Sequence, residues 1–241
     1  MKRWSMATFV ACFLVGCVTV SEQEVNSNFD SLQAARARIV LGLSYLDAGN
    51  MVKARENLEL AVKYAPDYYR SLNSIAYYYQ QVGEFDLAEQ AYIKALRKSS
   101  ENGDLFNNYG AFLCKRGEYD KADEYFNRAI EQPHYYRVSD SYENAAVCAL
   151  KKGNKRQAKH YFRRSLKHDP NSHISTIKLS RLEIEEGEIN AARDRLLRFQ
   201  HKFGYRPASL ALLIELEQKA GNEHLVREYR QTLNRLYPDF E

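Results

Sequence analysis

The chain has 241 residues, of which 45% are hydrophobic and 27% charged, so it is long enough for one large domain or two small ones and is not disordered. Its 5 Pro and 11 Gly exclude a collagen-like chain and a loop-rich β-sandwich. A net charge of +4 is small for this length and argues against a nucleic-acid partner. Four Cys are too few for a disulfide scaffold. The sequence also lacks the long apolar runs of a multipass membrane protein.

The N-terminus has the features of an export signal. A short basic start precedes an apolar stretch over residues 6–15, which has the length of a signal-peptide core and is too short to span a bilayer. The stretch ends in Leu14-Val15-Gly16-Cys17, which resembles the signal of bacterial lipoproteins. The resemblance implies removal of residues 1–16 and lipidation of Cys17. Because no Asp follows Cys17, it also implies anchoring in the outer membrane of a Gram-negative bacterium, on the periplasmic face. The alternative is a plain secretory signal with an incidental cysteine.

The rest of the chain carries an internal repeat. Gly-x-x-x-x-Ala recurs five times, with the alanines at positions 54, 88, 122, 158 and 192, and a sixth copy has Val226 in place of Ala. The spacings are 34, 34, 36, 34 and 34 residues, and 34 residues is the period of the tetratricopeptide repeat, a pair of packed helices. The pattern predicts an all-α fold, a right-handed superhelical solenoid of six helix pairs. An unrelated helical bundle is the alternative.

The predicted boundaries follow from this register. Residues 17–34 form the lipidated cysteine and a polar tether, and the six repeats span residues 35–68, 69–102, 103–138, 139–172, 173–206 and 207–240. The last repeat is degenerate, because Val226 replaces Ala and Arg230 stands where an aromatic residue is expected. A terminal repeat with a polar outer face is typical of the cap of a solenoid.

The first helices of the repeats are predicted to line a concave groove. In the first three repeats, the positions that face the groove carry three apolar residues, two asparagines, one tyrosine and one arginine. They are Ile39, Leu43, Leu46, Arg70, Asn73, Tyr77 and Asn107. Apolar walls with spaced amides suit an amphipathic helix or an extended peptide. The sequence therefore predicts a protein-binding groove. The alternative is that the apolar residues of repeat 1 pack under an N-terminal segment or a dimer partner.

Two cysteines, Cys114 and Cys148, occupy similar heights on the first helices of consecutive repeats. Neighbouring first helices pack side by side, and an exported protein meets an oxidising compartment. These positions predict a disulfide that contributes roughly 3–4 kcal/mol in the chain-entropy model. Two buried free thiols are the alternative.

Repeat 4 is rich in basic residues, and motifs for catalysis are missing. The basic residues are Lys151, Lys152, Lys155, Arg156, Lys159, Arg163, Arg164 and Lys167. They could meet lipid headgroups or an acidic partner, although a solvated face is the favoured interpretation. His160, His168 and His173 match no metal-binding spacing. The sequence has no G-x-S-x-G, H-E-x-x-H, C-x-x-C or Gly-rich phosphate loop. We therefore expect no enzyme activity, no cofactor, no metal and no small-molecule substrate.

The combination of a lipoprotein signal, a tether and six repeats resembles the type IV pilus biogenesis lipoproteins of the PilF/PilW family. The resemblance is carried by residues 107–114, by Gly117, Tyr119 and Ala122, and by Asn144, Cys148, Lys152 and Gly153. The two extra residues of repeat 3 and the ending Leu236-Tyr237-Pro238 also match. Where the family often has Asn-Leu-Gly in repeat 4, this chain has Asn144-Ala145-Ala146.

Members of that family act as pilotins. They bind the secretin, the outer-membrane channel of the type IV pilus, and promote its localisation and multimerisation in the outer membrane. The resemblance implies that the predicted groove binds this secretin. Two other interpretations remain open, a generic periplasmic adaptor for another envelope assembly and an accessory subunit of an envelope enzyme.

Overall fold

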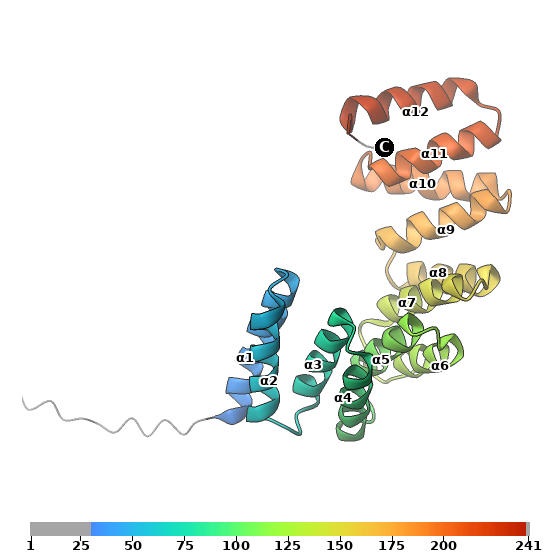
Figure 1. The fold of residues 1–241 in the computed structure, drawn as a ribbon. Helices are drawn as coiled ribbons and strands as arrows, with labels where there is room; N and C mark the ends of the chain where they lie inside the picture. The colour runs from blue at the N-terminus through green and yellow to red at the C-terminus, as the bar shows by residue number, and fades with distance from the viewer. Residues whose placement is uncertain (1–29, 240–241) are drawn as a thin grey trace, which may run out of the picture. The chain divides into compact units, whose positions relative to one another are not determined.

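The computed structural model describes residues 30–239, which form twelve α-helices and no β-strand. The helices are α1 (Ser31–Asp47), α2 (Met51–Tyr64), α3 (Tyr69–Val82), α4 (Phe85–Lys98), α5 (Gly103–Lys115), α6 (Tyr119–Ile130), α7 (Val138–Lys151), α8 (Lys155–His168), α9 (His173–Glu185), α10 (Ile189–Phe203), α11 (Pro207–Lys219) and α12 (Glu223–Leu236). They follow one another as six pairs (Figure 1). We call the odd-numbered helix of each pair the A helix and the even-numbered one the B helix. The predicted all-α solenoid is confirmed.

The first helix begins earlier than the sequence pattern predicts. Residues 31–34, predicted as the end of the tether, form the first turn of α1. No Pro or Gly interrupts this stretch, and Leu and Ala favour helix formation. Ala35, in the next turn, is fully buried and so holds the start of the helix against the fold. The predicted signal at 1–16, Cys17 and most of the predicted tether lie outside the described residues.

Each A helix passes into its B helix through a glycine in the left-handed region. The six turn glycines have φ between 74° and 84°, where a side chain would be strained. They are Gly49, Gly83, Gly117, Gly153, Gly187 and Gly221. This requirement explains why the Gly of the sequence motif recurs in every repeat.

Small residues allow the two helices of a pair to cross closely. The alanine of the motif is completely buried in all five repeats that carry it. In repeat 3, a Cβ added to Gly110 would lie 2.9 Å from Cε1 of Phe126 and 3.2 Å from the carbonyl oxygen of Ala122. The backbones therefore approach closely at this point, and the large side chains around the crossing fill the remaining space.

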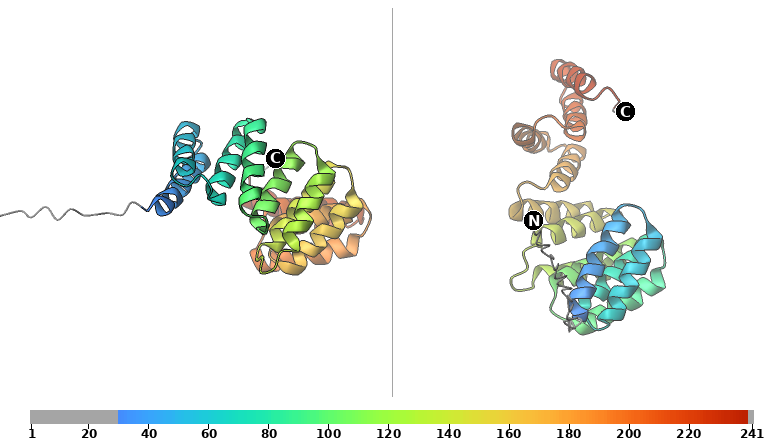
Figure 2. Two further views of the ribbon diagram at one scale, coloured as in Figure 1. Left: turned by 90° about the horizontal axis from the view of Figure 1, so that it is seen from below. Right: turned by 90° about the vertical axis from the view of Figure 1, so that its left-hand side faces the viewer.

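The helix array buries three apolar clusters. The N-terminal cluster includes Leu46 and Leu58, the central cluster runs from Leu72 to Leu182, and the C-terminal cluster begins at Ile184. The central cluster is rich in aromatic rings, whereas the C-terminal one is built largely of leucine. Helix α9 contributes to both, so the boundary between these two clusters lies within repeat 5. Figure 2 shows the repeats from two further sides, and its right-hand view has α1–α2 and α11–α12 at opposite ends of the array.

The last two repeats bury carboxylates at equivalent positions. Glu183 and Glu217 are each 1% exposed. Arg195 donates to Glu183 from Nε at 3.1 Å and from Nη2 at 2.9 Å. Arg193 donates to Glu217 from Nε at 2.7 Å and from Nη2 at 2.8 Å. The hydrogen bond from Arg193 holds the pKa of Glu217 below its usual range, although burial acts in the opposite direction.

The C-terminal end is closed by its own side chains. Val226, which replaces the motif alanine, is buried. The hydroxyl of Tyr237 donates to the carbonyl oxygen of Tyr205 at 2.7 Å, which ties the end of the chain to the turn before α11. Among the described residues, none of the helices has the length and apolar character needed to cross a bilayer.

Candidate functional site

Helix α1 presents part of the predicted groove. Ile39, Leu43 and Leu46 share one side of the helix because they are spaced by four and three residues. Leu46 is buried in the N-terminal cluster, whereas Ile39 and Leu43 are half-buried. Leu46 therefore serves the core, and Leu43 packs against the same cluster. The parts of Ile39 and Leu43 that stay exposed remain within reach of a partner.

The structure adds apolar residues that the sequence analysis missed. Val40 and Val52 are 67% and 70% exposed, and Leu41 and Met51 are exposed beside them in the sequence. In repeats 2–6, the residues equivalent to Leu41 are all buried, whereas no repeat precedes α1 among the residues that the structure describes. The sequence could have revealed these exposed residues, because the repeat pattern starts at repeat 1 and its apolar positions therefore have no earlier repeat to pack against. Leu41 lies two residues from both Ile39 and Leu43 and so faces another side of α1. We use the name N-terminal apolar surface for the whole set, which comprises Ile39, Val40, Leu41, Leu43, Met51 and Val52.

The predicted amides of the groove join repeats to one another. Asn107 is 3% exposed, and its Oδ1 accepts from Ser141 Oγ at 3.1 Å and from Asn144 Nδ2 at 3.0 Å. Asn73 is half-buried, and its Oδ1 accepts from Asn108 Nδ2 at 3.3 Å. The expectation that Asn107 bonds a bound peptide is therefore corrected, because stacking of repeats 3 and 4 buries and uses its carbonyl oxygen.

Helix α3 exposes the remaining two predicted residues. Tyr77 is exposed, as is Arg70, whose Nε donates to the hydroxyl of Tyr69 at 3.0 Å. This hydrogen bond raises the pKa of Arg70. Tyrosine and arginine are the residue types that dominate binding energy at protein interfaces. Both lie on the helix that follows the N-terminal apolar surface.

A disulfide joins the A helices of repeats 3 and 4. Cys114 on α5 and Cys148 on α7 are bonded, with their Cα atoms 5.8 Å apart. Both cysteines are buried. The disulfide and the hydrogen bonds of Asn107 cross the same α5–α7 interface. A covalent bond and hydrogen bonds therefore both join these two helices.

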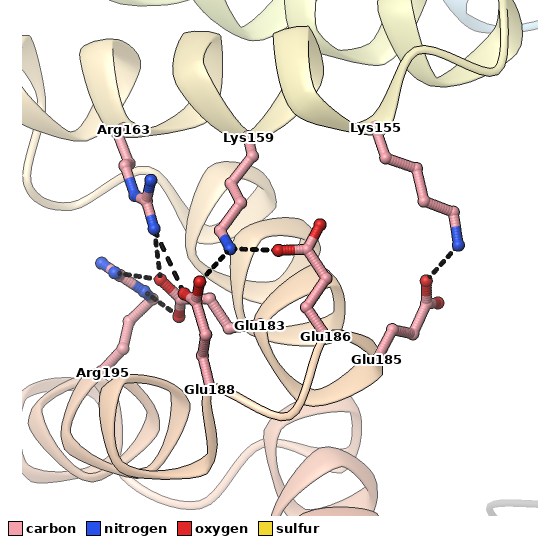
Figure 3. A network of polar contacts seen from close by, with 8 residues as sticks. All are labelled: Lys155, Lys159, Arg163, Glu183, Glu185, Glu186, Glu188 and Arg195. Atoms are coloured by element: carbon pink, nitrogen blue, oxygen red, sulfur yellow. Dashed lines mark hydrogen bonds and ion pairs between the residues drawn. The ribbon is translucent and has the colours of Figure 1, made fainter.

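The basic residues of repeat 4 divide between two faces of α8. On one face, three cations spaced by four residues point towards the acidic turn between α9 and α10 (Figure 3). The pairs are Lys155–Glu185 at 2.7 Å, Lys159–Glu188 at 2.6 Å, Arg163–Glu188 at 3.3 Å and Lys159–Glu186. Burial lowers the pKa of Lys159, but its hydrogen bonds to Glu186 and Glu188 outweigh burial and raise it. This face is therefore an ion-paired junction of repeats 4 and 5. Lys155 and Arg163 are exposed, as in a solvated face, whereas Lys159 is buried.

No group of three or more His, Cys, Asp or Glu side chains within residues 30–239 is arranged to hold a metal ion.

The comparisons with known proteins first define the class. Models of the tetratricopeptide repeat match residues 35–68, 69–100 and 101–171. The protein is thus a tetratricopeptide-repeat solenoid, and the structure continues the helix pairs of that class beyond the matched region to Leu236.

The relatives define the family. The chain is 31% identical to the type IV pilus assembly protein PilF of Pseudomonas aeruginosa over 237 residues, which cover 98% of this chain and 94% of the relative. The solved structure of P. aeruginosa PilF superposes with a TM-score of 0.74 at 31% identity, covering 87% of this chain and 94% of that one. PilW, described as a widely conserved type IV pilus biogenesis factor, gives a TM-score of 0.75 at 25% identity, covering 87% and 96%. The chain belongs to this PilF/PilW family of type IV pilus biogenesis proteins.

Proposed function

We propose that this protein is a lipid-anchored pilotin of the outer membrane. Its first repeat binds subunits of the type IV pilus secretin, and lipid on Cys17 directs the complex to the outer membrane, where the secretin multimerises. Membership of the family supports a role in type IV pilus biogenesis. To this role the proposal adds binding of the secretin, lipidation of Cys17 and localisation to the outer membrane.

The observation that carries the proposal is the N-terminal apolar surface. Val40 and Val52 each leave more than half of their surface in water at the open end of the array. Burial of apolar surface contributes roughly 25 cal/mol per Å², so a partner that covers this end gains free energy. An amphipathic helix of the secretin fits here because it could pack on α1 in the way that each repeat packs on the next.

The helices behind this surface are suited to hold it in a fixed shape. The Asn73–Asn108 hydrogen bond and the Asn107 contacts link α3, α5 and α7. A preformed binding surface loses less conformational entropy on association. Binding, transport and release of a subunit need no chemical step, which agrees with the expectation of an adaptor rather than an enzyme.

The first experiment tests the lipid. In cells that carry Cys17→Ala, we expect heat-stable secretin oligomers to disappear from the outer membrane or to shift to the inner membrane, because acyl chains provide the stable anchor. Immunoblots of separated membranes measure this, with the amount of the variant protein matched to wild type. An unchanged oligomer pattern would overturn the role of the lipid and leave a generic periplasmic adaptor as the better interpretation.

The second experiment tests the surface. Val40→Arg and Leu43→Arg should each abolish or strongly reduce co-purification of the secretin, because a charge would have to be buried at the interface. Leu236→Arg, which changes an exposed leucine at the far end of the array, is the matched control and should bind normally. If both α1 variants fold and still bind the secretin like wild type, the first repeat is not the binding site.

A further inference from the structure

The second face of α8 has a different environment from its ion-paired face. Arg164 lies on this face, and its Nε and Nη2 donate to the hydroxyl of Tyr142 at 3.3 and 3.1 Å. Arg156 and His160 are exposed on the same side. No carboxylate of the described residues 30–239 forms an ion pair with Arg156 or Arg164. This face therefore carries positive charge that the fold itself does not neutralise.

Arg164 has counterparts in the two neighbouring repeats. Arg128 stands 36 residues before it and Arg198 stands 34 residues after it, which are the spacings of the repeat itself. Neither forms an ion pair with a carboxylate in the part of the chain that the structure describes. Three equivalent B helices, α6, α8 and α10, thus each present one unpaired arginine at the same position.

Each of the three arginines lines a cavity beside the preceding B helix. The cavities measure about 240 Å³ at Arg128, about 760 Å³ at Arg164 and about 310 Å³ at Arg198. The first two linings are equivalent, since Phe106 and Tyr125 accompany Arg128 as Tyr142 and Tyr161 accompany Arg164. The third cavity keeps the arginine, Arg198, but has Thr176 and Arg195 in the places of the two rings.

Aromatic rings hold two of the three arginines, Arg128 and Arg164, in position. The guanidinium carbon of Arg128 lies 4.1 Å from the ring centre of Phe106 and 4.9 Å from that of Tyr125. Arg164 lies 5.3 Å from the ring centre of Tyr142. A stacked guanidinium is restricted in its motion but keeps N–H groups at its edge for an anion. These side chains are thus partly preorganised for carboxylate binding.

The walls of the largest cavity indicate what kind of anion fits. Amide side chains of Asn127, Asn154 and Gln157 line it together with Tyr142 and Tyr161. Amides suit the backbone of an extended peptide, and arginine forms paired hydrogen bonds with carboxylates. One acidic group lies near, because Asp123 accepts from Tyr161 at 2.8 Å and from Gln157 at 3.3 Å. The Asp123 carboxylate is occupied by these hydrogen bonds within the protein. The cavity itself is lined by two arginines, Arg156 and Arg164, so its net charge is positive.

We propose that the grooves at Arg128, Arg164 and Arg198 together form a second protein-binding site, which takes an acidic peptide segment of a partner. The segment crosses α6, α8 and α10, and its carboxylates meet the three arginines in turn. A membrane surface fits less well, because the arginines are set into cavities with amide and aromatic walls. This site uses B helices of repeats 3–5 and is independent of the first repeat.

The test uses the full chain in detergent and a fluorescent peptide of repeated Glu-Ala units, with a Gln-Ala peptide as the uncharged probe. Fluorescence anisotropy should show binding of the Glu-Ala peptide that weakens with added salt. The triple variant Arg128→Gln/Arg164→Gln/Arg198→Gln should lose affinity by about tenfold or more, since each surface charge pair contributes modestly. The control triple variant Lys63→Gln/Lys151→Gln/Lys178→Gln removes the same charge from exposed positions outside these cavities and should bind like wild type.

Several results would overturn the proposal. Equal losses in the two triple variants would show general electrostatic attraction, and equal binding of the Gln-Ala peptide would show that charge is not recognised. Arginine-dependent binding to phosphatidylglycerol vesicles without binding to the Glu-Ala peptide would identify a membrane surface instead. Circular dichroism of each variant establishes that a loss of binding is not a loss of fold. The single variant Arg156→Gln, at an exposed position in the largest cavity, should also weaken binding while leaving the stacked arginines untouched.

Discussion

Repeats 3 and 4 and repeats 5 and 6 share one sequence register but are stabilised by different interactions. In repeats 3 and 4, the residues eleventh in the repeat are Leu113 and Ala149, and the A helices carry a disulfide. In repeats 5 and 6, the equivalent residues are the buried Glu183 and Glu217, each held by an arginine. The same helix pair thus tolerates either an apolar residue or a neutralised charge at its centre.

This difference follows from the way a solenoid is assembled. Each repeat contacts only its neighbours, so the interactions at one interface can change without affecting distant ones. A covalent and aromatic interface resists salt and acid, whereas an ion-paired one depends on both. The two halves should therefore respond differently to reduction, mutation and pH.

Loss of the disulfide should have the largest effect. The double variant Cys114→Ala/Cys148→Ala should be less stable by roughly 3–4 kcal/mol, because the bond closes a long loop in the unfolded chain. Urea unfolding measures the loss, and hydrogen exchange should locate it in α5 and α7 rather than in α11 and α12. A reductant should destabilise the wild type similarly and leave the variant unchanged. Equal loss of protection in α11 and α12 would contradict independent halves.

Removal of the arginine that pairs with the buried Glu217 should destabilise the C-terminal half. Arg193→Met leaves Glu217 buried without its charged partner, which should cost about 3 kcal/mol. Thermal and urea unfolding measure this, and protection should be lost first in α10–α12. The double variant Arg193→Met/Glu217→Leu should recover most of the stability, because no uncompensated charge remains. If the double variant is no more stable than Arg193→Met, the ion pair itself stabilises the fold, and the cost of the single variant is not due to the unpaired Glu217 charge.

A third change tests the packing within repeat 3, between the start of α5 and the segment that joins α6 to α7. A Cβ on Gly103 would lie 2.5 Å from Cδ2 of Tyr135, so Gly103→Ala should destabilise the protein by about 2 kcal/mol through overpacking. The melting temperature measures the effect. In a Tyr135→Ala background the ring is gone, and the same Gly103→Ala change should cost little.

Acidification should have the smallest and most local effect. The hydrogen bonds from Arg193 and Lys159 hold the pKa values of Glu217 and Glu188 below the usual 4.5. A lowered pKa means that these groups stabilise the fold above pH 4.5 and lose that contribution as the pH falls through their folded pKa values. Hydrogen exchange between pH 6 and pH 3 should show α9–α12 opening before α5–α7. Arg193→Met/Glu217→Leu should open less steeply with acid than wild type does, and an equal slope would contradict the assignment.

Much of the fold follows from short-range pattern. The recurring Gly and Ala predict the helix pairs, because a left-handed turn requires Gly and a close helix crossing requires a small residue. The start of α1 at Ser31 does not follow from the pattern, since the first turn of this helix lies outside the repeat. The role of Ile39 and Leu43 of α1 in binding a partner stays a prediction.

What the pattern could not determine is which side chains meet. Asn107 and Lys159 have ordinary polar identities in the sequence, yet one is buried between α5 and α7 and the other is paired with the α9–α10 turn. Leu41 is exposed, whereas its equivalents in the following repeats are buried, a difference that no single repeat reveals. The sequence by itself determined the period, the helices and the turns, because these depend on residues within one repeat. The tertiary structure decided the partners and the open surfaces, because these depend on residues about one repeat away in the chain that stacking brings into contact.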